Sequence, residues 1–357
     1  MTIFLTIILI VGAFYILFAL ILSLSQQFGE PHPSADLSVS LIIPARNEAR
    51  DLHRLFDSLN KLDYPADKLQ IILVDHRSTD GTYALMKQFK RSSKFPLKII
   101  RIESETQGAA YKTEALTAGV KAASGEALTF IDAECRFQPG WLKAMSGMLK
   151  SGYDMAGGMI MMEGESFFAA LQRMDWIFLC AAGSGFSGLK IPQSLFGKNL
   201  IITRRLYLKS GGFPNKKAWT EDLELVKRCA GKGKITLNLS PQCAVHSLPA
   251  RNLSEFFRQR IRWLKGSPSV RIPGLLAMAS ALAMDAVFIA GLFHSTTLAL
   301  FALLMKIIGD WLILRKSLKN LNINNEIILI PFYSLFSILY QLTLVILTPI
   351  VKNLRWR

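Results

Sequence analysis

The chain begins with an almost unbroken apolar stretch from Ile3 to Leu24, and residues 1–29 carry no charged side chain. A helix of about 20 residues rises ~1.5 Å per residue and crosses the ~30 Å hydrocarbon core of a bilayer. No basic residue precedes the stretch, and it is longer than the ~7–15 apolar residues typical of a signal peptide. We therefore expect a retained transmembrane anchor over residues 1–25.

Three more apolar blocks follow Pro273, namely Gly274–Phe293, Thr296–Leu314 and Ile327–Ile350. Such blocks also occur as buried helices of soluble proteins, but their lengths and their crowding at one end favour membrane spans. Pro331 lies inside the third block, so an interfacial or re-entrant course is an alternative for that block. We expect two or three transmembrane helices over residues 272–350.

The first two of these blocks contain the charged residues Asp285, Lys306 and Asp310. If the two blocks form a hairpin that turns near His294, Asp285 and Lys306 lie at a similar depth. Isolated charges in a bilayer are costly, so such side chains usually pair. We predict an ion pair between Asp285 and Lys306 with a structural role.

Between the apolar ends, from Leu37 to about Val270, short β-rich runs alternate with segments of helical periodicity. The expected strands are Ser38–Pro44, Leu69–Asp75, Phe95–Ile102 and Glu126–Asp132. The expected helices are Glu48–Leu62, Gly81–Phe89 and Gly108–Ala123. This order predicts an α/β domain over residues 37–250, with a mostly parallel, Rossmann-like sheet covered by helices. Ligands bind such sheets at the carboxyl ends of the strands, where Asp75 and Asp132 stand.

Composition and charge narrow the class of protein. The chain is 51% hydrophobic, which excludes a disordered polycation, and its net charge is +16.

Lysines and arginines gather before the first C-terminal block and after the second, so the positive-inside rule puts the N-terminus outside and the α/β domain in the cytosol. The basic tail, residues 351–357 with Lys352, Arg355 and Arg357, does not fit this topology if the last block spans. The positive charge fits an anionic lipid surface and not a nucleic acid partner.

Two further segments leave alternatives open. Gly183, Gly185 and Gly188 form a G-x-G-x-x-G pattern, but no strand precedes it, so we expect a flexible loop and not a dinucleotide-binding turn. The aromatic-rich stretch Ser166–Phe186 is expected either to face the bilayer surface or to be a core helix. The four cysteines have no C-x-x-C spacing, which argues against a zinc site.

Three small groups of residues carry candidate chemistry. Asp132 and Glu134 form an acid-x-acid pair just past a strand end, and such oxygen ligands suit Mg²⁺ or Mn²⁺. Glu221-Asp222 opens a helical stretch, where acids also serve as ordinary caps. A basic amphipathic segment, residues 251–271, contains a Q-x-x-R-W motif, and its arginine suits phosphate binding. The alternative for that segment is an interfacial helix, and both interpretations are compatible.

Together these features resemble the membrane-bound branch of the inverting family 2 glycosyltransferases, which have the GT-A fold. The resemblance covers roughly Ser38 to Gly266. It rests on the order and spacing of IIPARNE (Ile42–Glu48), VDHRSTDGT (Val74–Thr82), Lys112 in YKTEAL, IDAEC around Asp132, GKNLIITRR with GGF (Gly197–Phe213), TED (Thr220–Asp222) and Q-x-x-R-W (Gln259–Trp263).

The resemblance implies a role for each matching position. Pro44, Ala45, Glu48 and Asp75 would lie at the nucleoside end, and Lys112 would face the nucleotide. Asp132 and Glu134 would hold the sugar nucleotide and its Mg²⁺ or Mn²⁺. Asp222, beside Glu221, would be the general base for the acceptor hydroxyl, and Gln259, Arg262 and Trp263 would lie near the diphosphate and the acceptor.

Two positions depart from the family pattern: Glu134 stands where Asp is usual, and His76 replaces a frequent second Asp. His76 is either a nucleotide contact or a surface residue at a strand end.

Polysaccharide-extruding relatives usually have more membrane helices than the four expected here. We therefore expect transfer from a UDP-sugar to a membrane lipid, similar to ceramide- or carotenoid-type glucosyltransferases, in a multi-pass protein of a bacterial cell membrane. The alternatives are a processive polysaccharide synthase and a non-catalytic nucleotide-sugar binder. The sugar, the lipid and the oligomeric state are not readable from the sequence.

Overall fold

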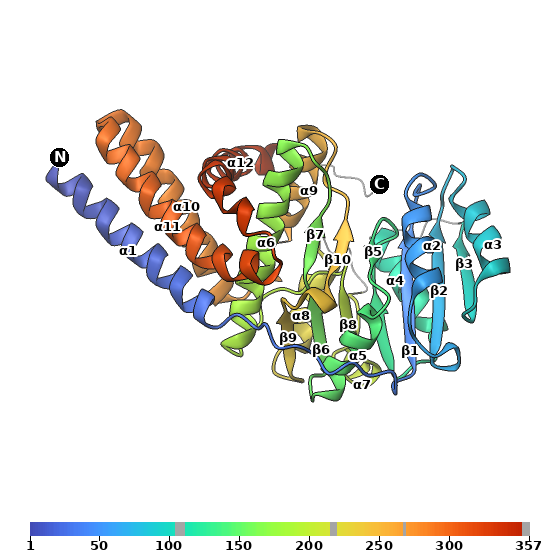
Figure 1. The fold of residues 1–357 in the computed structure, drawn as a ribbon. Coiled ribbons are helices and arrows are strands. Elements are labelled where there is room, and N and C mark those ends of the chain that lie inside the picture. Colours follow the sequence, from blue (N-terminus) through green and yellow to red (C-terminus); the bar gives the residue numbers. More distant parts are fainter. Residues whose placement is uncertain (104–110, 215–219, 267–268, 352–357) are drawn as a thin grey trace. The chain divides into compact units, whose positions relative to one another are not determined.

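The computed structural model describes residues 1–103, 111–214, 220–266 and 269–351, and the chain divides into two compact units (Figure 1). The α/β unit comprises Phe28–Met161 and Ser194–Leu248. Among the described residues, the helical unit comprises Met1–Gln27, Met162–Gln193 and the chain from Pro249 to Val351. The basic tail Lys352–Arg357 expected from the sequence lies outside the described residues.

A seven-stranded sheet forms the centre of the α/β unit. In the order of pairing its strands are β3 (Leu97–Ile102), β2 (Leu69–His76), β1 (Val39–Ala45), β4 (Ala127–Phe130), β8 (Leu200–Thr203), β6 (Met155–Gly158) and β9 (Ile235–Asn238). β8 runs antiparallel to both of its neighbours, and the other pairs are parallel. The expectation of a mostly parallel α/β sheet is therefore confirmed.

Helices cover this sheet because its strands are apolar on both faces. Every residue of β1 is buried, as its continuous apolar run predicts. Gly119 allows close contact, since a Cβ there would lie 2.4 Å from Cγ2 of Ile42 in β1. The helices of the unit are α2 (Leu52–Lys61), α3 (Thr82–Ser92), α4 (Tyr111–Ala122), α5 (Trp141–Lys150), α7 (Arg204–Lys209) and α8 (Glu221–Cys229), with 3₁₀ turns η1 (Ala66–Lys68) and η2 (Pro241–Cys243).

A second, three-stranded sheet was not expected from the sequence. Its order is β5 (Arg136–Phe137), β10 (Val245–Ser247) and β7 (Ile160–Met162). β10 runs antiparallel to β5, with His246 opposite Arg136. This register brings Ser247 to the chain segment that contains Glu134, which matters for the site described below.

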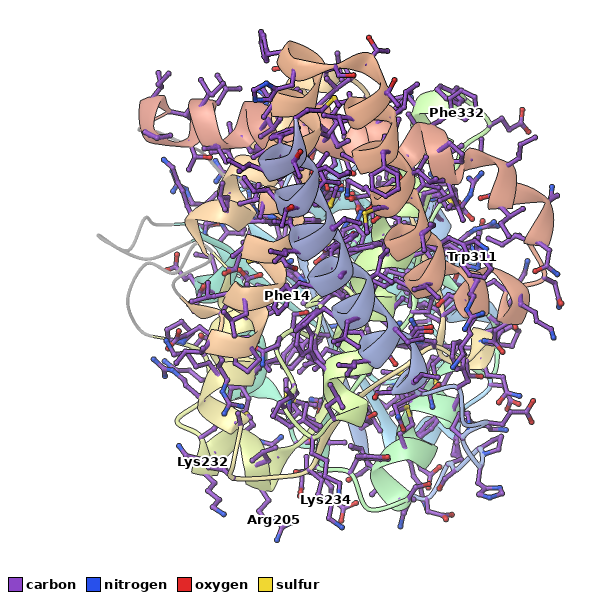
Figure 2. All side chains as sticks on the ribbon, turned by 90° about the vertical axis from the view of Figure 1, so that its left-hand side faces the viewer. Phe14, Arg205, Lys232, Lys234, Trp311 and Phe332 are labelled. Atoms are coloured by element: carbon purple, nitrogen blue, oxygen red, sulfur yellow. The ribbon has the colours of Figure 1, made fainter. Side chains whose placement is uncertain are left out.

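The helical unit consists of α1 (Thr2–Leu24), α6 (Phe167–Gly188), α9 (Leu253–Lys265), α10 (Ile272–His294), α11 (Thr296–Asn320) and α12 (Ile330–Ile350), with η4 (Asn324–Leu329) before α12. Within the described residues, four helical segments are long and apolar enough to cross a membrane: α1, α10, α11 and η4 with α12. Large apolar side chains such as Phe14 and Phe332 are about half exposed on this unit (Figure 2). Pro331 stands in the first turn of α12, where its missing N–H interrupts no helical hydrogen bond, so the block is not broken there.

The charged residues of the apolar blocks meet inside the helical unit. Lys306 Nζ lies 3.5 Å from Asp285 Oδ1 and 3.4 Å from Asp310 Oδ2, and all three side chains are buried. Tyr15 and Ser334 donate hydrogen bonds to the Asp310 carboxylate, the latter at 2.6 Å. The predicted Asp285–Lys306 pair is confirmed, and α10 and α11 form the expected hairpin with Ser295 between them.

The expectation of a loop at Gly183–Gly188 is wrong, because these glycines form the last turns of α6. Small residues are needed there for packing: a Cβ on Gly188 would lie 1.8 Å from the carbonyl oxygen of Ser25, and one on Gly185 would lie 2.5 Å from that of Leu22. Most of α6 is buried, which favours the core-helix interpretation of residues 166–186. The segment also belongs to the helical unit, although the sequence grouped it with the α/β domain.

Candidate active site

The carboxyl ends of β1, β2 and β4 bring together half of the expected site residues. Pro44 and Ala45 are the last residues of β1, and Ala45 stands opposite Asp75 in the parallel register with β2. β4 pairs with the other edge of β1 and ends two residues before Asp132. The sheet therefore brings three segments together that are far apart in the sequence, as expected for an α/β ligand site.

Asp75 lies at the end of β2 and its side chain is fully buried. Neither of its carboxylate oxygens accepts a hydrogen bond from the described residues. Arg101 Nε lies 3.4 Å from Asp75 Oδ2, and its guanidinium stacks over the ring of Tyr83 at 4.4 Å. A buried carboxylate without hydrogen-bond donors is costly, which indicates a place for an N–H group of a ligand.

His76, beside Asp75, is also fully buried, so the interpretation of a surface histidine is wrong. Its Nε2 lies 3.0 Å from Oε2 of Glu114 in α4. This contact joins the end of β2 to α4, the helix that carries Lys112.

Glu48 follows β1, and its backbone N–H donates a 2.8 Å hydrogen bond to Oγ1 of Thr82. Burial, and after it the charges of Glu134 and Asp132, raise the pKa of Glu48 from its ordinary value of 4.5 to about 8. Glu48 and the acid-x-acid pair are thus electrostatic neighbours. Glu48 therefore binds its proton more tightly than an exposed glutamate does.

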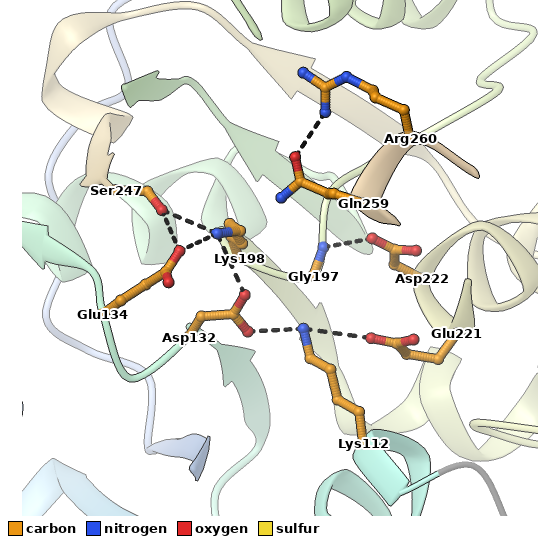
Figure 3. Close-up of polar contacts among 10 residues, drawn as sticks. All are labelled: Lys112, Asp132, Glu134, Gly197, Lys198, Glu221, Asp222, Ser247, Gln259 and Arg260. Atoms are coloured by element: carbon orange, nitrogen blue, oxygen red, sulfur yellow. Dashed lines mark hydrogen bonds and ion pairs between the residues drawn. The ribbon is translucent and has the colours of Figure 1, made fainter. Parts of the chain in front are cut away.

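Lys112 links the acid-x-acid pair to the acids that open α8. Its Nζ lies 2.7 Å from Asp132 Oδ1 and 3.4 Å from Glu221 Oε1 (Figure 3). The three side chains come from α4, from the segment after β4 and from α8, and each is largely buried. The structure thus brings together residues that the sequence could only assign to separate motifs.

Glu134 is held by two groups that sequence reasoning did not single out, Lys198 and Ser247. Lys198 Nζ forms an ion pair with Glu134 Oε1, lies 3.8 Å from Asp132 Oδ2 and donates a 2.9 Å hydrogen bond to Ser247 Oγ (Figure 3). Ser247 in turn donates a 2.6 Å hydrogen bond to Glu134 Oε1. The two carboxylates raise the pKa of Lys198 above its usual range although burial acts to lower it.

Asp222 is the second residue of α8, and a neighbouring turn orients its carboxylate. The N–H of Gly197 donates a 2.9 Å hydrogen bond to Asp222 Oδ2, and Leu223 N–H donates one of 2.9 Å to Oδ1. Burial and then the adjacent Glu221 charge raise the pKa of Asp222, against the lowering effect of the Gly197 N–H and Lys112. A carboxylate whose pKa is raised is a stronger base, which suits proton abstraction at neutral pH.

The Q-x-x-R-W motif lies on α9, which belongs to the helical unit. Gln259 Oε1 accepts a 2.8 Å hydrogen bond from Arg260, whose guanidinium stacks 4.1 Å from the ring of Trp263. Arg260 also forms a buried ion pair with Asp175 of α6. Arg262 is partly exposed in the last turn of α9. Arg260, a residue inside the motif that the sequence left without a role, is therefore the group that contacts its glutamine and tryptophan.

Comparison with known protein families identifies the class. The sequence model of glycosyl transferase family 2 matches residues 40–207, and that of glycosyl transferase family group 2 matches residues 127–350. The second match covers more than half of the chain. The protein belongs to glycosyl transferase family 2 and is a glycosyltransferase.

Individual relatives share between 25% and 33% sequence identity with this chain over the matched residues. Glycosyltransferase AglE of Haloferax volcanii is 28% identical over 239 residues, which make up 65% of this chain and 73% of that relative. Beta-monoglucosyldiacylglycerol synthase of Synechocystis sp. is 25% identical over 245 residues, 66% of this chain and 48% of that protein. Dolichol-phosphate mannosyltransferase of Pyrococcus furiosus is 33% identical over 126 residues, 34% of this chain and 33% of that enzyme.

A solved structure of similar fold is that of a mannosyltransferase from Pyrobaculum calidifontis in complex with GDP-Man and Mn²⁺. It superimposes with a TM-score of 0.60 at 17% identity and covers 95% of this chain and 99% of its own. The likeness confirms the GT-A fold that the sequence resemblance implies.

The residues at the acid-x-acid pair fit a divalent metal ion that is bound together with the donor. Among the described residues, no three His, Cys, Asp or Glu side chains are arranged to hold a metal by themselves. Asp132 and Glu134 offer two carboxylates, and Mg²⁺ typically takes one or two carboxylates and completes its shell with substrate phosphates. Asp132 and Glu134 are therefore the residues that would hold Mg²⁺ or Mn²⁺.

Proposed function

We propose that this glycosyltransferase transfers a sugar from a nucleoside diphosphate sugar, in the default case a UDP-sugar, to a lipid acceptor with inversion at the anomeric carbon. Asp222 would be the general base. The observation that carries the proposal is the turn Gly197-Lys198: Gly197 orients Asp222, and Lys198 contacts the acid-x-acid pair. Two consecutive residues thus contact the proposed base and the proposed diphosphate site.

The nucleoside end of the site is proposed to lie at Asp75. Its buried carboxylate accepts no hydrogen bond from the described residues, so an N–H of a nucleobase is a suitable partner. Pro44 and Ala45 on β1 and Glu48 just beyond it would line the same end. The buried side chain of Glu48, whose pKa is raised by burial and by the charges of Glu134 and Asp132, would face the donor at this end.

The reaction needs a single displacement. Asp222 removes the proton of the acceptor hydroxyl, the acceptor oxygen bonds to the anomeric carbon, and the bond from that carbon to the diphosphate oxygen breaks with its electron pair. A bound Mg²⁺ or Mn²⁺ would neutralise charge that develops on the leaving diphosphate. Lys112 and Lys198 add fixed positive charge beside Asp132 and Glu134. Attack opposite to the leaving group inverts the anomeric centre.

A lipid acceptor is supported by the helical unit. Four of its helical segments are long and apolar enough to span a bilayer, and α1 exposes large apolar side chains such as Ile10 and Phe14. Two of the similar proteins are, by name, a beta-monoglucosyldiacylglycerol synthase and a dolichol-phosphate mannosyltransferase. We propose a multi-pass membrane protein whose α/β unit faces the cytosol and the anionic lipid surface, as the charge distribution predicts.

The two alternative functions, a processive polysaccharide synthase and a non-catalytic nucleotide-sugar binder, make different structural demands. A processive polysaccharide synthase would require a passage for the polymer across the membrane, and a non-catalytic binder would not need an oriented base such as Asp222. Purified protein should be incubated with labelled UDP-sugars and GDP-sugars and with a total lipid extract. A labelled lipid with inverted stereochemistry supports the proposal. A long labelled polymer favours the synthase, and donor binding without turnover favours the binder.

A further inference from the structure

The acid-x-acid pair is contacted by the ammonium group of Lys198, which occupies a place between the two carboxylates. Its Nζ touches Glu134 Oε1 and lies 3.8 Å from Asp132 Oδ2, and the side chain is only 15% exposed. Lys112 lies on the other side of Asp132, at 2.7 Å from Oδ1. The carboxylates proposed to hold a divalent ion are therefore already paired with two monovalent cations.

The backbone at Lys198 is held firmly on both sides. Gly197 N–H bonds Asp222, and the fully buried Asn199 donates to the carbonyl oxygens of Met159 at 2.9 Å and Cys243 at 2.7 Å. Trp141 Nε1 donates a further 3.1 Å hydrogen bond to Asn199 Oδ1. These contacts fix the backbone of the turn, whereas the four-carbon stem of the Lys198 side chain keeps rotational freedom.

Charge and geometry make Lys198 and a divalent ion compete for the same oxygen atoms. Two cations at contact distance from one carboxylate repel each other strongly where water is scarce. A diphosphate adds acceptor oxygens and negative charge beside Glu134 and Asp132. It offers the Lys198 ammonium an alternative partner that is at least as strongly charged as the Glu134 carboxylate.

We propose that Lys198 is a diphosphate-binding residue that blocks the acid pair until the donor arrives. In the free protein its ammonium holds Glu134 with the help of Ser247. When a nucleoside diphosphate enters, the ammonium moves from Glu134 to a phosphate oxygen, and the two carboxylates become available to a divalent ion. Nucleotide and metal then bind with strong positive cooperativity. This inference rests on the proposed function, because it assumes that a nucleoside diphosphate occupies this site.

The inference is tested by metal binding to the full-length protein in detergent, with free Mn²⁺ measured by its electron paramagnetic resonance signal. The wild type should bind Mn²⁺ weakly alone and about tenfold or more tightly with UDP or GDP present. Lys198→Met should bind Mn²⁺ without nucleotide about tenfold more tightly than the wild type, since the competing charge is gone. The same variant should bind metal-free UDP or GDP about tenfold more weakly, because a charge-assisted contact is lost.

Two further variants separate the charge of Lys198 from a general effect on folding. Lys198→Arg keeps the positive charge and should keep weak Mn²⁺ binding in the absence of nucleotide. Lys232→Met removes an exposed lysine of the same unit and should leave both affinities unchanged. Equal Mn²⁺ affinity of the wild type and Lys198→Met without nucleotide, or unchanged nucleotide affinity in that variant, would overturn the inference. Sugar transfer to lipid by the wild type is measured separately. Transfer without the metal-binding effects would retain the proposed function and overturn the inference, and the metal-binding effects without transfer would do the opposite.

Discussion

Gly197 and Asp222 are joined by a 2.9 Å hydrogen bond from the backbone N–H of the glycine to Oδ2 of the carboxylate. The bond fixes the orientation of the Asp222 carboxylate. Because the donor is a backbone N–H, it is still present when Asp222 is replaced by asparagine. Asp222 is therefore a rigidly placed acceptor of a proton, which is the property that a general base needs.

Asp222→Asn removes the base but keeps the size of the side chain and an oxygen for the Gly197 N–H. We expect the transfer rate to fall by roughly 10²–10⁴-fold, the usual contribution of a positioned base. Nucleotide affinity, measured by calorimetry, should stay within about twofold because Asp222 is not placed at the nucleoside end. Glu224→Gln on the same helix, where Glu224 pairs with Arg228 at 3.2 Å, is the matched control and should keep normal turnover. Near-normal transfer by Asp222→Asn would contradict the assignment.

Glu48 should make stability depend on pH in an unusual direction. Its pKa is raised from 4.5 to about 8 on folding, so the folded state binds this proton more tightly than the unfolded state. The contribution of protonated Glu48 to the free energy of unfolding is fully present below about pH 4.5 and is lost as the pH rises toward 8. In the presence of a chelator, the melting temperature of the wild type should fall relative to Glu48→Gln between pH 5.5 and pH 8.5.

The control for this experiment is Glu103→Gln, since the Glu103 side chain is 75% exposed. It should show the same pH dependence as the wild type. A melting difference between the wild type and Glu48→Gln that does not change with pH would mean that Glu48 does not take up a proton on folding.

Lys306 neutralises two carboxylates inside the helical unit, so its loss should be severe. In Lys306→Met both Asp285 and Asp310 remain buried without their cation, and we expect destabilisation of about 3–5 kcal/mol. Thermal unfolding in detergent measures the effect. The double variant Lys306→Met with Asp285→Asn should recover part of the loss, because one unpaired charge is removed with its partner. No recovery in the double variant would argue against the Asp285–Lys306 pair.

Arg260 is expected to be a positioning residue for the Q-x-x-R-W motif. It pairs with Asp175, whose Oδ1 also accepts a 2.7 Å hydrogen bond from Tyr340 of α12. Asp175→Asn leaves the Arg260 guanidinium buried without its countercharge and should cost about 3–5 kcal/mol of stability. Tyr340→Phe removes one hydrogen bond from a neutral donor to the same carboxylate and leaves the Arg260 ion pair in place, so it should cost only about 1–3 kcal/mol.

A role in positioning is distinguished from a purely structural one by fluorescence and kinetics at a temperature where both variants remain folded. Asp175→Asn should change the emission of Trp263 and lower kcat, while the KM for the donor changes little. A variant that loses stability but keeps the kinetic constants of the wild type would assign the pair to folding alone.

Much of the α/β unit was predictable because its signals are local. The runs at β1 and β2 are continuously apolar and β-rich, and the acids that end them or follow β4 stand where a parallel sheet binds ligands. The Asp285–Lys306 pair was also predictable, since two charges in a short apolar hairpin have few other partners. The small sheet β5-β10-β7 escaped prediction because its strands are only two or three residues long and come from distant segments.

The sequence by itself determined the class of enzyme, the apolar helices and the list of acids, because periodicity, length and motif order are properties of neighbouring residues. Only the tertiary structure decided which cation meets which acid. Lys198 and Glu134 are 64 residues apart, and they meet because β8 and β10 place the Gly197–Asn199 turn and Ser247 beside the end of β4. The need for glycine at positions 185 and 188 of α6 was likewise decided by packing, since a Cβ at either position would collide with the backbone of residues 22–25.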